Sequence, residues 1–284
     1  MKGIFSVIPL VHVFVFIHLG RPQVQCEVMG MVPFAYDDQY SQCTEEMETE
    51  ISMLLETEKS LDPDFKGIWD KATLEWEKRK LQSSLTELPK GFRDEHGIAI
   101  LIYTDKDYPS PEQSFPRRFN EAVRTSVTSL SDYIESFHYK ALHYYMTTAL
   151  HLFQPECRKV YRGIHDKHFE PPTGMCPVIR FGQFTSSSSS VETAKSFGLD
   201  SFFYITTCFG VDIGNLSTDR SENEVLIPGS EIFFVSNYTV EGHQFVITST
   251  KQTCHHYNCA FLGGERAQAC ILDSDNKEAE SAGG

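Results

Sequence analysis

The stretch that decides the fold is Arg220-Ser221-Glu222-Asn223-Glu224-Val225-Leu226-Ile227-Pro228, in which two carboxylates lead into three large apolar residues. The apolar triplet, closed by Pro-Gly, is typical of a short buried strand. In an extended chain, residues two positions apart share a face, with a rise of roughly 3.3 Å per residue. The pattern therefore predicts that Glu222 and Glu224 lie on one side of the chain, about 6.6 Å apart along the backbone.

Paired carboxylates at this range suit a reaction in which one stabilises a sugar cation and the other orients a nucleophile. The alternative is a solvated acidic turn before a strand, because most charged side chains in proteins are exposed. Taken alone, these nine residues favour the solvated turn. The choice between the two depends on the rest of the chain.

The chain has 284 residues, enough for one large domain or two small ones, and 40% of them are hydrophobic. The net charge of −14 argues against a nucleic-acid partner, because binding a phosphate backbone requires cationic side chains. We expect a single domain over residues 26–272. The polar residues 273–284 are expected to form a disordered tail.

The apolar run from Ile4 to Leu19 is short and contains two histidines. It predicts a secretory signal peptide over residues 1–25 rather than a stable membrane span. No hydrophobic stretch follows the small residues of the C-terminal tail, as a glycolipid anchor signal would require. We therefore expect a secreted, extracellular protein; the alternative is a cell-surface form anchored in a longer isoform.

Eight cysteines in an exported chain indicate disulfides. No Cys-x-x-Cys pair occurs, and the spacings do not resemble a zinc site. The segment Cys254-His255-His256-Tyr257-Asn258-Cys259 resembles a ligand cluster, but oxidised cysteines explain it better, and we expect no bound metal. Two sequons, Asn215-Leu216-Ser217 and Asn237-Tyr238-Thr239, are glycosylation acceptors consistent with export.

The N-terminal half has apolar side chains at helical spacing. Helices are predicted over residues 44–58, 66–84 and 115–127, and the clearest one runs from Asp132 to about Phe153 with Asp132 and Glu135 as a cap pair. Residues 96–103 are mostly apolar, which leaves helix and strand open. The His138 and His143 side chains are interpreted as ordinary helix residues.

After residue 156 the segments become short, β-branched and aromatic, with turn residues between them. The predicted strands include residues 160–161, 177–181, 201–207, 231–235 and 245–248. Helices followed by strands predict an α+β fold, with a helical part at about 31–153 packed on a β-rich core at about 157–272.

Two further segments carry residues suited to chemistry. Val160-Tyr161-Arg162-Gly163 places an arginine at a strand end, where its fork geometry suits phosphate or amide groups and the glycine lets a ligand approach the backbone. Phe184-Thr185-Ser186-Ser187-Ser188 follows a strand and offers a hydroxyl that can hold a carboxylate. The alternatives are a surface arginine and a flexible serine loop. The absence of a Gly-x-Ser-x-Gly elbow argues against a serine hydrolase.

Six segments in order carry a family resemblance across nearly the whole mature chain. They are Asp37-Asp38-Gln39-Tyr40, Phe137 to Tyr145, Val160-Tyr161-Arg162-Gly163, Arg180-Phe181-Gly182-Gln183-Phe184, Glu224-Val225-Leu226-Ile227-Pro228 and Tyr257-Asn258-Cys259-Ala260. Together they resemble the arginine-specific mono-ADP-ribosyltransferases of the vertebrate ecto-enzyme family, whose R-S-E signature also occurs in one group of bacterial toxins.

The resemblance implies that NAD is the co-substrate and that the fold is the ADP-ribosyltransferase-like fold. It implies that Arg162 clamps the diphosphate and a ribose of NAD, and that the backbone of Gly163 holds the nicotinamide amide. By the same resemblance, Phe197 stacks on nicotinamide.

The resemblance also assigns roles to the serine and the two carboxylates. Ser186 begins the family's Ser-Thr-Ser-like triplet, which reads Ser-Ser-Ser here, and it positions Glu224. Glu224 is the catalytic glutamate that stabilises an oxocarbenium-like transition state as nicotinamide leaves. Glu222 selects arginine as the acceptor, so the implied activity is ADP-ribosylation of arginine on extracellular proteins.

Disulfides and alternative functions complete the expectations. The resemblance implies the pairs Cys43–Cys259 and Cys157–Cys208, and it leaves the pairing of Cys26, Cys176, Cys254 and Cys270 open. One alternative function is NAD hydrolysis on the same fold. Another is a secreted binding module with a vestigial site, against which the intact set of Arg162, Ser186 and Glu224 argues.

Overall fold

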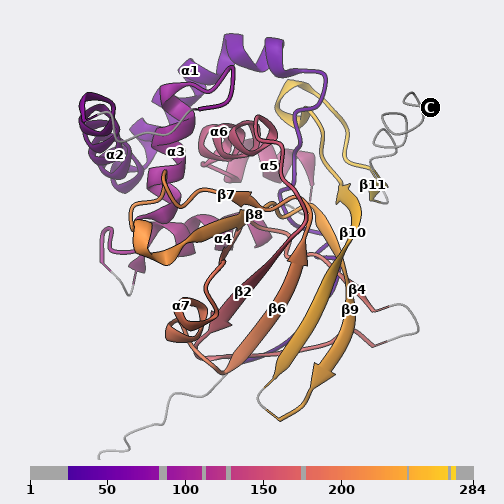
Figure 1. The fold of residues 1–284 in the computed structure, drawn as a ribbon. Helices are drawn as coiled ribbons and strands as arrows, with labels where there is room; N and C mark the ends of the chain where they lie inside the picture. Colours follow the sequence, from indigo (N-terminus) through magenta and orange to yellow (C-terminus); the bar gives the residue numbers. More distant parts are fainter. Residues whose placement is uncertain are drawn as a thin grey trace, which may run out of the picture.

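The computed structural model describes residues 25–82, 88–110, 113–125, 129–173, 177–241, 243–267 and 270–272. Helices of the N-terminal half gather at one end of a long twisted sheet formed by the C-terminal half (Figure 1). The expected α+β fold is confirmed. Residues 1–24 of the expected signal peptide, Cys176 and the C-terminal tail lie outside the described residues.

The helical part contains α1 (Thr44–Leu61), α2 (Pro63–Leu81), α3 (Asp94–Thr104), α4 (Phe115–Thr125), α5 (Leu130–Ser136) and α6 (Lys140–His151). Residues 96–103, left open by the sequence, belong to helix α3. Every residue from His96 to Thr104 is buried, which explains why the apolar pattern there has no helical period.

The single helix expected from Asp132 to Phe153 is wrong, because α5 and α6 are separate helices. The side chain of Ser129, rather than an Asp132–Glu135 pair, caps α5. Phe137 then leaves the helix in an extended conformation (φ −88°, ψ 103°). The carboxylate of Glu58 on α1 accepts hydrogen bonds from the backbone N–H groups of residues 140 and 141, at 2.8 and 3.0 Å. A cap from another helix thus starts α6.

The main sheet follows the strand order β4-β9-β10-β6-β2-β5-β8-β7. In that order the strands are Val178–Ile179, Glu231–Thr239, Gln244–His255, Ser201–Thr207, Arg158–Ile164, Thr185–Ser188, Glu224–Ile227 and Val211–Asp212. A short strand, β11 (Ile271–Leu272), pairs with β10, and β1 (Gln25–Val28) pairs with β3 (Lys167–Glu170). Helix α7 (Val191–Ser196) lies beside β2 (Figure 1).

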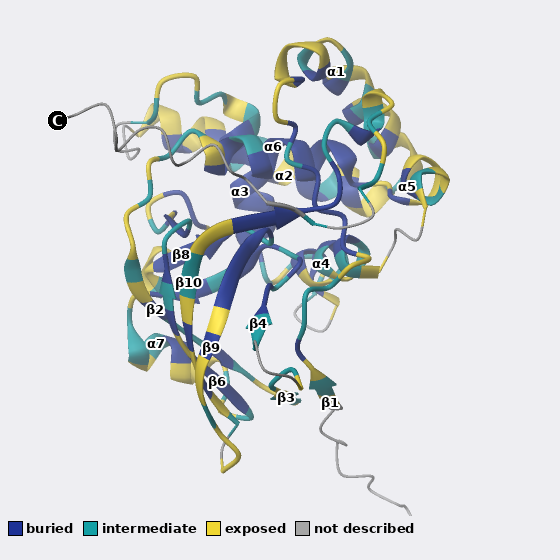
Figure 2. Cartoon of the chain, turned by 90° about the vertical axis from the view of Figure 1, so that its right-hand side faces the viewer, coloured by how far each residue is buried: buried dark blue, intermediate teal, exposed yellow. Residues whose placement is uncertain are grey.

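Strand β8 lies between two hydrophobic cores. Leu226 packs in the core that the helices form, while Val225 and Ile227 pack in the core of the sheet. Side chains alternate along a strand, so both faces of β8 are covered and all four of its residues are buried. Figure 2 shows the same division, with the buried surfaces of α3 and α6 facing the strands. The predicted buried strand is confirmed, and Glu224 begins it.

The two disulfides implied by the resemblance, Cys43–Cys259 and Cys157–Cys208, are present. A third joins Cys254 to Cys270, which the sequence left open. Cys26 is exposed and unpaired among the described residues. Across the described ranges, the helices are all too short or too polar to cross a membrane.

Candidate active site

A cleft of ≈ 310 Å³ opens where β2, β5, β8 and α7 meet the helical part. Pockets of this size are typical of small-molecule sites, which begin at about 300 Å³. The cleft brings together residues from Tyr103 to Glu224, which lie 121 positions apart in the chain. All six site residues expected from the sequence line it: Arg162, Gly163, Ser186, Phe197, Glu222 and Glu224.

Glu224 is almost completely buried at the start of β8. The hydroxyl of Ser217 donates a hydrogen bond to its Oε2 atom at 2.9 Å, while Oε1 has no hydrogen-bond partner of good geometry among the described residues. Burial raises the pKa of Glu224, although the hydroxyls of Ser186 and Ser217 and the positive charge of Lys106 oppose this rise. The Oε1 atom can therefore accept a hydrogen bond from a substrate hydroxyl.

The serine expected to hold Glu224 shares this task with another serine. Ser186 faces the carboxylate and favours its charged form, but the hydrogen bond of good geometry comes from Ser217. Ser217 is fully buried in the loop between β7 and β8. The sequence marked it only as the third residue of a glycosylation sequon, and that pattern carries no signal for a bond to Glu224.

Arg162 lies on β2 and lines the cleft. Its Nη1 atom donates to the carbonyl oxygen of Ser186 at 2.6 Å, the one hydrogen bond that it makes among the described residues. Burial lowers the pKa of Arg162, and nearby Tyr103 and Glu224 partly offset the effect. The remaining donors of a guanidinium, which has five in all, are left for a ligand.

Gly163 follows Arg162 on β2, and its neighbours explain why a glycine stands there. A Cβ atom would lie 2.2 Å from the carbonyl oxygen of Ala194 and 2.4 Å from that of Gly198. The absence of a side chain therefore lets α7 and the turn after it approach β2 closely. This close approach explains the glycine without a ligand, which differs from the reason that the sequence suggested.

The expectation that Glu222 and Glu224 lie on one extended chain is wrong. Residues Arg220–Glu222 form a 3₁₀ turn, and Asn223 adopts a left-handed conformation with φ 48° and ψ 51°. Asparagine tolerates this region better than most residues, so the chain can turn sharply between the two carboxylates. Ser188, which is paired with Glu224 across the sheet, donates to the carbonyl oxygen of Glu222 at 2.6 Å. Both carboxylates still line the cleft.

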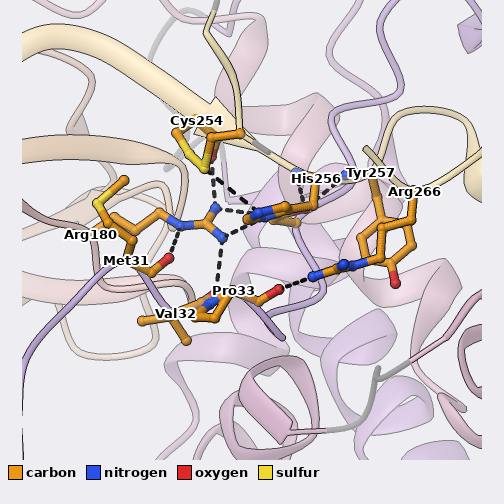
Figure 3. Close-up of a disulfide and its surroundings, with 10 residues drawn as sticks. Met31, Val32, Pro33, Arg180, Cys254, His256, Tyr257 and Arg266 are labelled. Atoms are coloured by element: carbon orange, nitrogen blue, oxygen red, sulfur yellow. Dashed lines mark hydrogen bonds and ion pairs between the residues drawn. A yellow bond between two sulfur atoms is a disulfide. The ribbon is translucent and has the colours of Figure 1, made fainter. Parts of the chain in front are cut away.

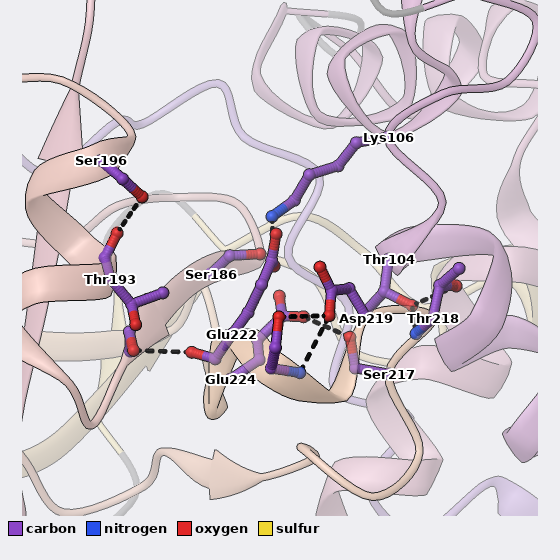
Figure 4. Close-up of polar contacts among 12 residues, drawn as sticks. Thr104, Lys106, Ser186, Thr193, Ser196, Ser217, Thr218, Asp219, Glu222 and Glu224 are labelled. Carbon is purple, nitrogen blue, oxygen red and sulfur yellow. Dashed lines mark hydrogen bonds and ion pairs between the residues drawn. The ribbon is translucent and has the colours of Figure 1, made fainter.

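The two carboxylates have different surroundings. Glu222 is more exposed than Glu224 and forms an ion pair with Lys106, which lies in the loop after α3 (Figure 4). The Lys106 ammonium also lies 4.3 Å from the centroid of the Phe197 ring. The sequence gave no signal for Lys106, because the segment 105–110 contains none of the recognised motifs.

Helices α3 and α4 supply the opposite wall of the cleft. The hydroxyl of Tyr103 donates to the carbonyl oxygen of Phe184 at 2.7 Å, and the Nδ2 atom of Asn120 donates to the Tyr103 hydroxyl at 3.0 Å. The Oδ1 atom of Asn120 is buried without a hydrogen-bond partner among the described residues. Burial raises the pKa of Tyr103 to about 12, so the phenol stays protonated.

A buried carboxylate with one unused acceptor, an arginine with unused donors and a second carboxylate at the mouth define a class of site. A fixed negative charge stabilises a sugar cation as a glycosidic bond breaks, and arginine is suited to a phosphate. The cleft therefore suits an enzyme that breaks a glycosidic bond in a phosphate-bearing sugar compound and transfers the sugar.

Comparison with known proteins supports this class of enzyme. The family model of the NAD:arginine ADP-ribosyltransferases matches residues 29–255. The mouse ecto-ADP-ribosyltransferase 5 is 38% identical over 252 residues, which cover 86% of this chain and 79% of the mouse protein. The chicken erythroblast NAD(P)(+)–arginine ADP-ribosyltransferase is 38% identical over 87% of this chain and 81% of its own length.

A solved structure leads to the same result. A variant of the mono-ADP-ribosyltransferase ART2.2 in complex with NAD is 35% identical, covers 82% of this chain and 98% of its own, and superposes with a TM-score of 0.68. The chain belongs to the NAD:arginine ADP-ribosyltransferase family. Its co-substrate is NAD, and its disulfides and its ecto-enzyme relatives indicate an extracellular or cell-surface location.

Proposed function

We propose that this chain transfers ADP-ribose from NAD to arginine side chains of extracellular proteins and releases nicotinamide. The observation that carries the proposal is the buried Glu224 carboxylate, whose Oε1 atom has no hydrogen-bond partner of good geometry among the described residues, in a cleft that Arg162 also lines. In this proposal Glu224 is the catalytic glutamate. The other residues hold the two substrates around it.

The proposed chemistry begins with loss of nicotinamide. As the bond between the ribose and nicotinamide breaks, positive charge develops on the sugar, and the Glu224 carboxylate is complementary to that charge. A ribose hydroxyl donates to Oε1, while the hydroxyls of Ser186 and Ser217 hold the carboxylate in place. Because burial disfavours the charged carboxylate in the free enzyme, its interaction with a cation gains strength in the transition state.

NAD is held by groups on β2 and α7 in this proposal. Arg162 directs its unused donors at the diphosphate and a ribose, since the guanidinium fork suits phosphate oxygens. The backbone of Gly163 contacts the nicotinamide amide. Phe197, which is 40% exposed at the end of α7, offers a ring face on which nicotinamide can stack.

Glu222 is the proposed acceptor residue. A protonated guanidinium is a poor nucleophile, and a carboxylate beside it can orient it and accept a proton as it attacks. Glu222 lines the mouth of the cleft on a turn, with a side chain that is 15% exposed, so a protein-borne arginine can reach it. Water needs less orientation than a guanidinium, so hydrolysis depends less on this residue.

Hydrolysis of NAD is the second candidate function, and one observation favours it. Lys106 already occupies the Glu222 carboxylate with a positive charge. An acceptor must compete with this charge, whereas water does not. The ratio of transfer to hydrolysis therefore depends on the Lys106–Glu222 pair.

We also propose that the protein is secreted. The asparagines of both sequons, Asn215 and Asn237, are exposed, and the three disulfides require an oxidising compartment. Expression in a secreting cell should give glycosylated protein in the medium. Recovery mainly on membranes, with release by a phospholipase, would contradict this proposal.

The experiment compares Glu224→Gln with Glu222→Gln, because each keeps the shape of its side chain and removes the charge. Nicotinamide release is measured beside transfer of label from NAD to the small arginine analogue agmatine. Glu224→Gln should lower both activities by about a hundredfold to a thousandfold. Glu222→Gln should remove transfer and leave most of the hydrolysis.

The two variants are controls for each other, since both remove one charge within the same cleft. The assignment is wrong if Glu222→Gln loses both activities equally. It is also wrong if Glu224→Gln retains full transfer.

A further inference from the structure

Lys106 places a positive charge on the acceptor side of the cleft. Its ammonium pairs with Glu222 (Figure 4) and lies over the ring of Phe197, 4.3 Å from the centroid. A carboxylate beside an aromatic face is also an environment that binds a guanidinium. Among the described residues, Lys106 is the one ion-pair partner of Glu222.

The chain just before Lys106 is hydrogen-bonded to the loop that carries Glu222. The hydroxyl of Thr104, the last residue of α3, accepts a hydrogen bond from the backbone N–H of Thr218 at 2.9 Å (Figure 4). On the other side, the Asp105 carboxylate forms an ion pair with Lys71 on α2. These contacts fix the start of the Lys106 side chain relative to the cleft, while its four-carbon stem remains free to move.

The ion pair is able to open. The Lys106 side chain is 41% exposed and that of Glu222 is 15% exposed. Partly exposed pairs of this kind contribute little to stability, so breaking one costs little. The pair therefore does little to hold the fold together, yet it places a cation where the acceptor must bind.

We propose that Lys106 is a built-in competitor of the acceptor, whose ammonium holds the place of the incoming guanidinium on Glu222. This inference rests on the proposed acceptor role of Glu222. An arginine must displace Lys106 before transfer, so Lys106 raises the KM for the acceptor and favours hydrolysis. The ammonium itself does not attack the sugar, because its nitrogen has no free electron pair.

The most direct test replaces Lys106 by arginine, whose guanidinium can itself accept ADP-ribose. In Lys106→Arg, a guanidinium nitrogen at residue 106 forms a bond to the ribose carbon as the bond to nicotinamide breaks. Nicotinamide leaves with the electron pair of that bond, and the guanidinium releases a proton to Glu222 or water. Mass mapping after incubation with NAD should find ADP-ribose on residue 106, at a rate independent of protein concentration.

Two variants control this labelling. Lys106→Arg combined with Glu222→Gln should lose the label, because the carboxylate that orients the guanidinium is gone. Lys106→Gln should carry no label at residue 106. Both positions are partly exposed, so these substitutions leave the core of the fold intact.

A second measurement uses Lys106→Met, which removes the charge. The KM for agmatine should fall by about two- to fivefold, the factor that matches a partly exposed ion pair. The ratio of transfer to nicotinamide release should rise. The matched control is Lys66→Met, which removes an exposed lysine on α2 that pairs with Asp70 rather than Glu222 and should leave the KM unchanged.

The inference and the proposed function fail in different ways. If wild type labels agmatine and Glu222→Gln does not, but Lys106→Arg stays unlabelled and Lys106→Met keeps the wild-type KM, the competitor role is overturned and the proposed function stands. If Glu222→Gln labels agmatine as well as wild type, the acceptor role of Glu222 and the competitor role of Lys106 both fall.

Discussion

Two arginines, the fully buried Arg180 after β4 and the half-buried Arg162 in β2, have opposite surroundings. The guanidinium of Arg180 is enclosed by acceptors from two segments of the chain, residues 31–37 and 254–256 (Figure 3). It contacts the backbone oxygens of Met31, Val32 and Cys254, the carboxylate of Asp37 and the His256 ring, at distances of 2.6 to 3.2 Å. Arg162 makes a single hydrogen bond among the described residues, to a backbone oxygen.

The comparison separates a structural arginine from one that is available to a ligand. Burying a charge is costly unless it is paired and hydrogen-bonded, and Arg180 meets that requirement within the protein. Arg162 meets it only in part, and its other donors lie at the cleft. We expect Arg180 to contribute to stability and Arg162 to contribute to NAD binding.

The largest expected effect is on stability, in Arg180→Met. Methionine fills much of the volume but leaves the Asp37 carboxylate, which is 2% exposed, without its arginine partner and with the His256 ring as its other side-chain contact. Breaking a buried ion pair in this way costs about 3–5 kcal/mol of unfolding free energy. Urea denaturation with the disulfides intact measures the loss. The matched control is Arg158→Met, a partly exposed arginine on β2 paired with Asp212, which should change stability by less than about 1 kcal/mol.

An Arg180→Met protein as stable as wild type would contradict the structural role of Arg180. It would mean that full hydrogen bonding does not identify the structural arginine. A double variant with Asp37→Asn should recover part of the loss, because it removes the unpaired charge.

The next effect is on binding, in Arg162→Met. If the unused donors of Arg162 contact NAD, losing a hydrogen bond to a charged group costs about 1.5–3 kcal/mol, or roughly 10- to 150-fold in Kd. Calorimetric titration of NAD in a Glu224→Gln background avoids turnover during the measurement. The melting temperature should fall much less than in Arg180→Met. Unchanged NAD affinity would contradict the ligand-binding role of Arg162.

The sequence predicted the elements better than the contacts. Helices and strands follow local patterns, so most of the expected segments are present, and the buried strand after Glu224 is confirmed. The break at Phe137 could not be predicted, because it depends on a cap from Glu58, about 80 residues away. Arg162 and Arg180 have similar settings in the sequence, since each follows two residues that favour a strand, Val160-Tyr161 and Val178-Ile179.

The candidate site, like the fold, was only partly predictable from the sequence. The residues that the resemblance named line one cleft, but the bond from Ser217 and the ion pair from Lys106 depend on loops whose course no local pattern encodes. The turn at Asn223 also overrode the extended spacing expected for the two carboxylates. Long-range contacts of polar side chains decide these details, whereas hydrophobic periodicity decides the fold.

A smaller effect concerns the pH dependence of the structural region. His143 is buried near Asp37, and burial lowers its pKa to about 3. The unfolded chain protonates this histidine below a pH of about 6.5 and the folded chain does not, so the stability from neutral His143 is lost as pH falls. Relative to His143→Gln, wild type should lose up to about 1.4 kcal/mol per pH unit below 6.

Urea denaturation of both proteins at pH 7.5, 6.0 and 5.0 measures this difference. The comparison with His143→Gln removes the contribution of other buried groups, such as Glu58, whose pKa burial raises to about 7. A difference that stays constant from pH 7.5 to pH 5.0 would show that His143 titrates alike in both states.

The smallest effect concerns the pH dependence of activity, because neighbouring charges shift the pKa of Glu224. Burial raises its pKa, Lys106 lowers it and Glu222 raises it. The acid limb of kcat/KM for nicotinamide release reports the ionisation of Glu224 in the free enzyme. Removing the positive charge in Lys106→Met should move this limb to higher pH, and removing the negative charge in Glu222→Gln should move it to lower pH. Each shift should be less than about one pH unit, because the pair is partly exposed. Shifts in the same direction would mean that the acid limb reports the ionisation of a group other than Glu224.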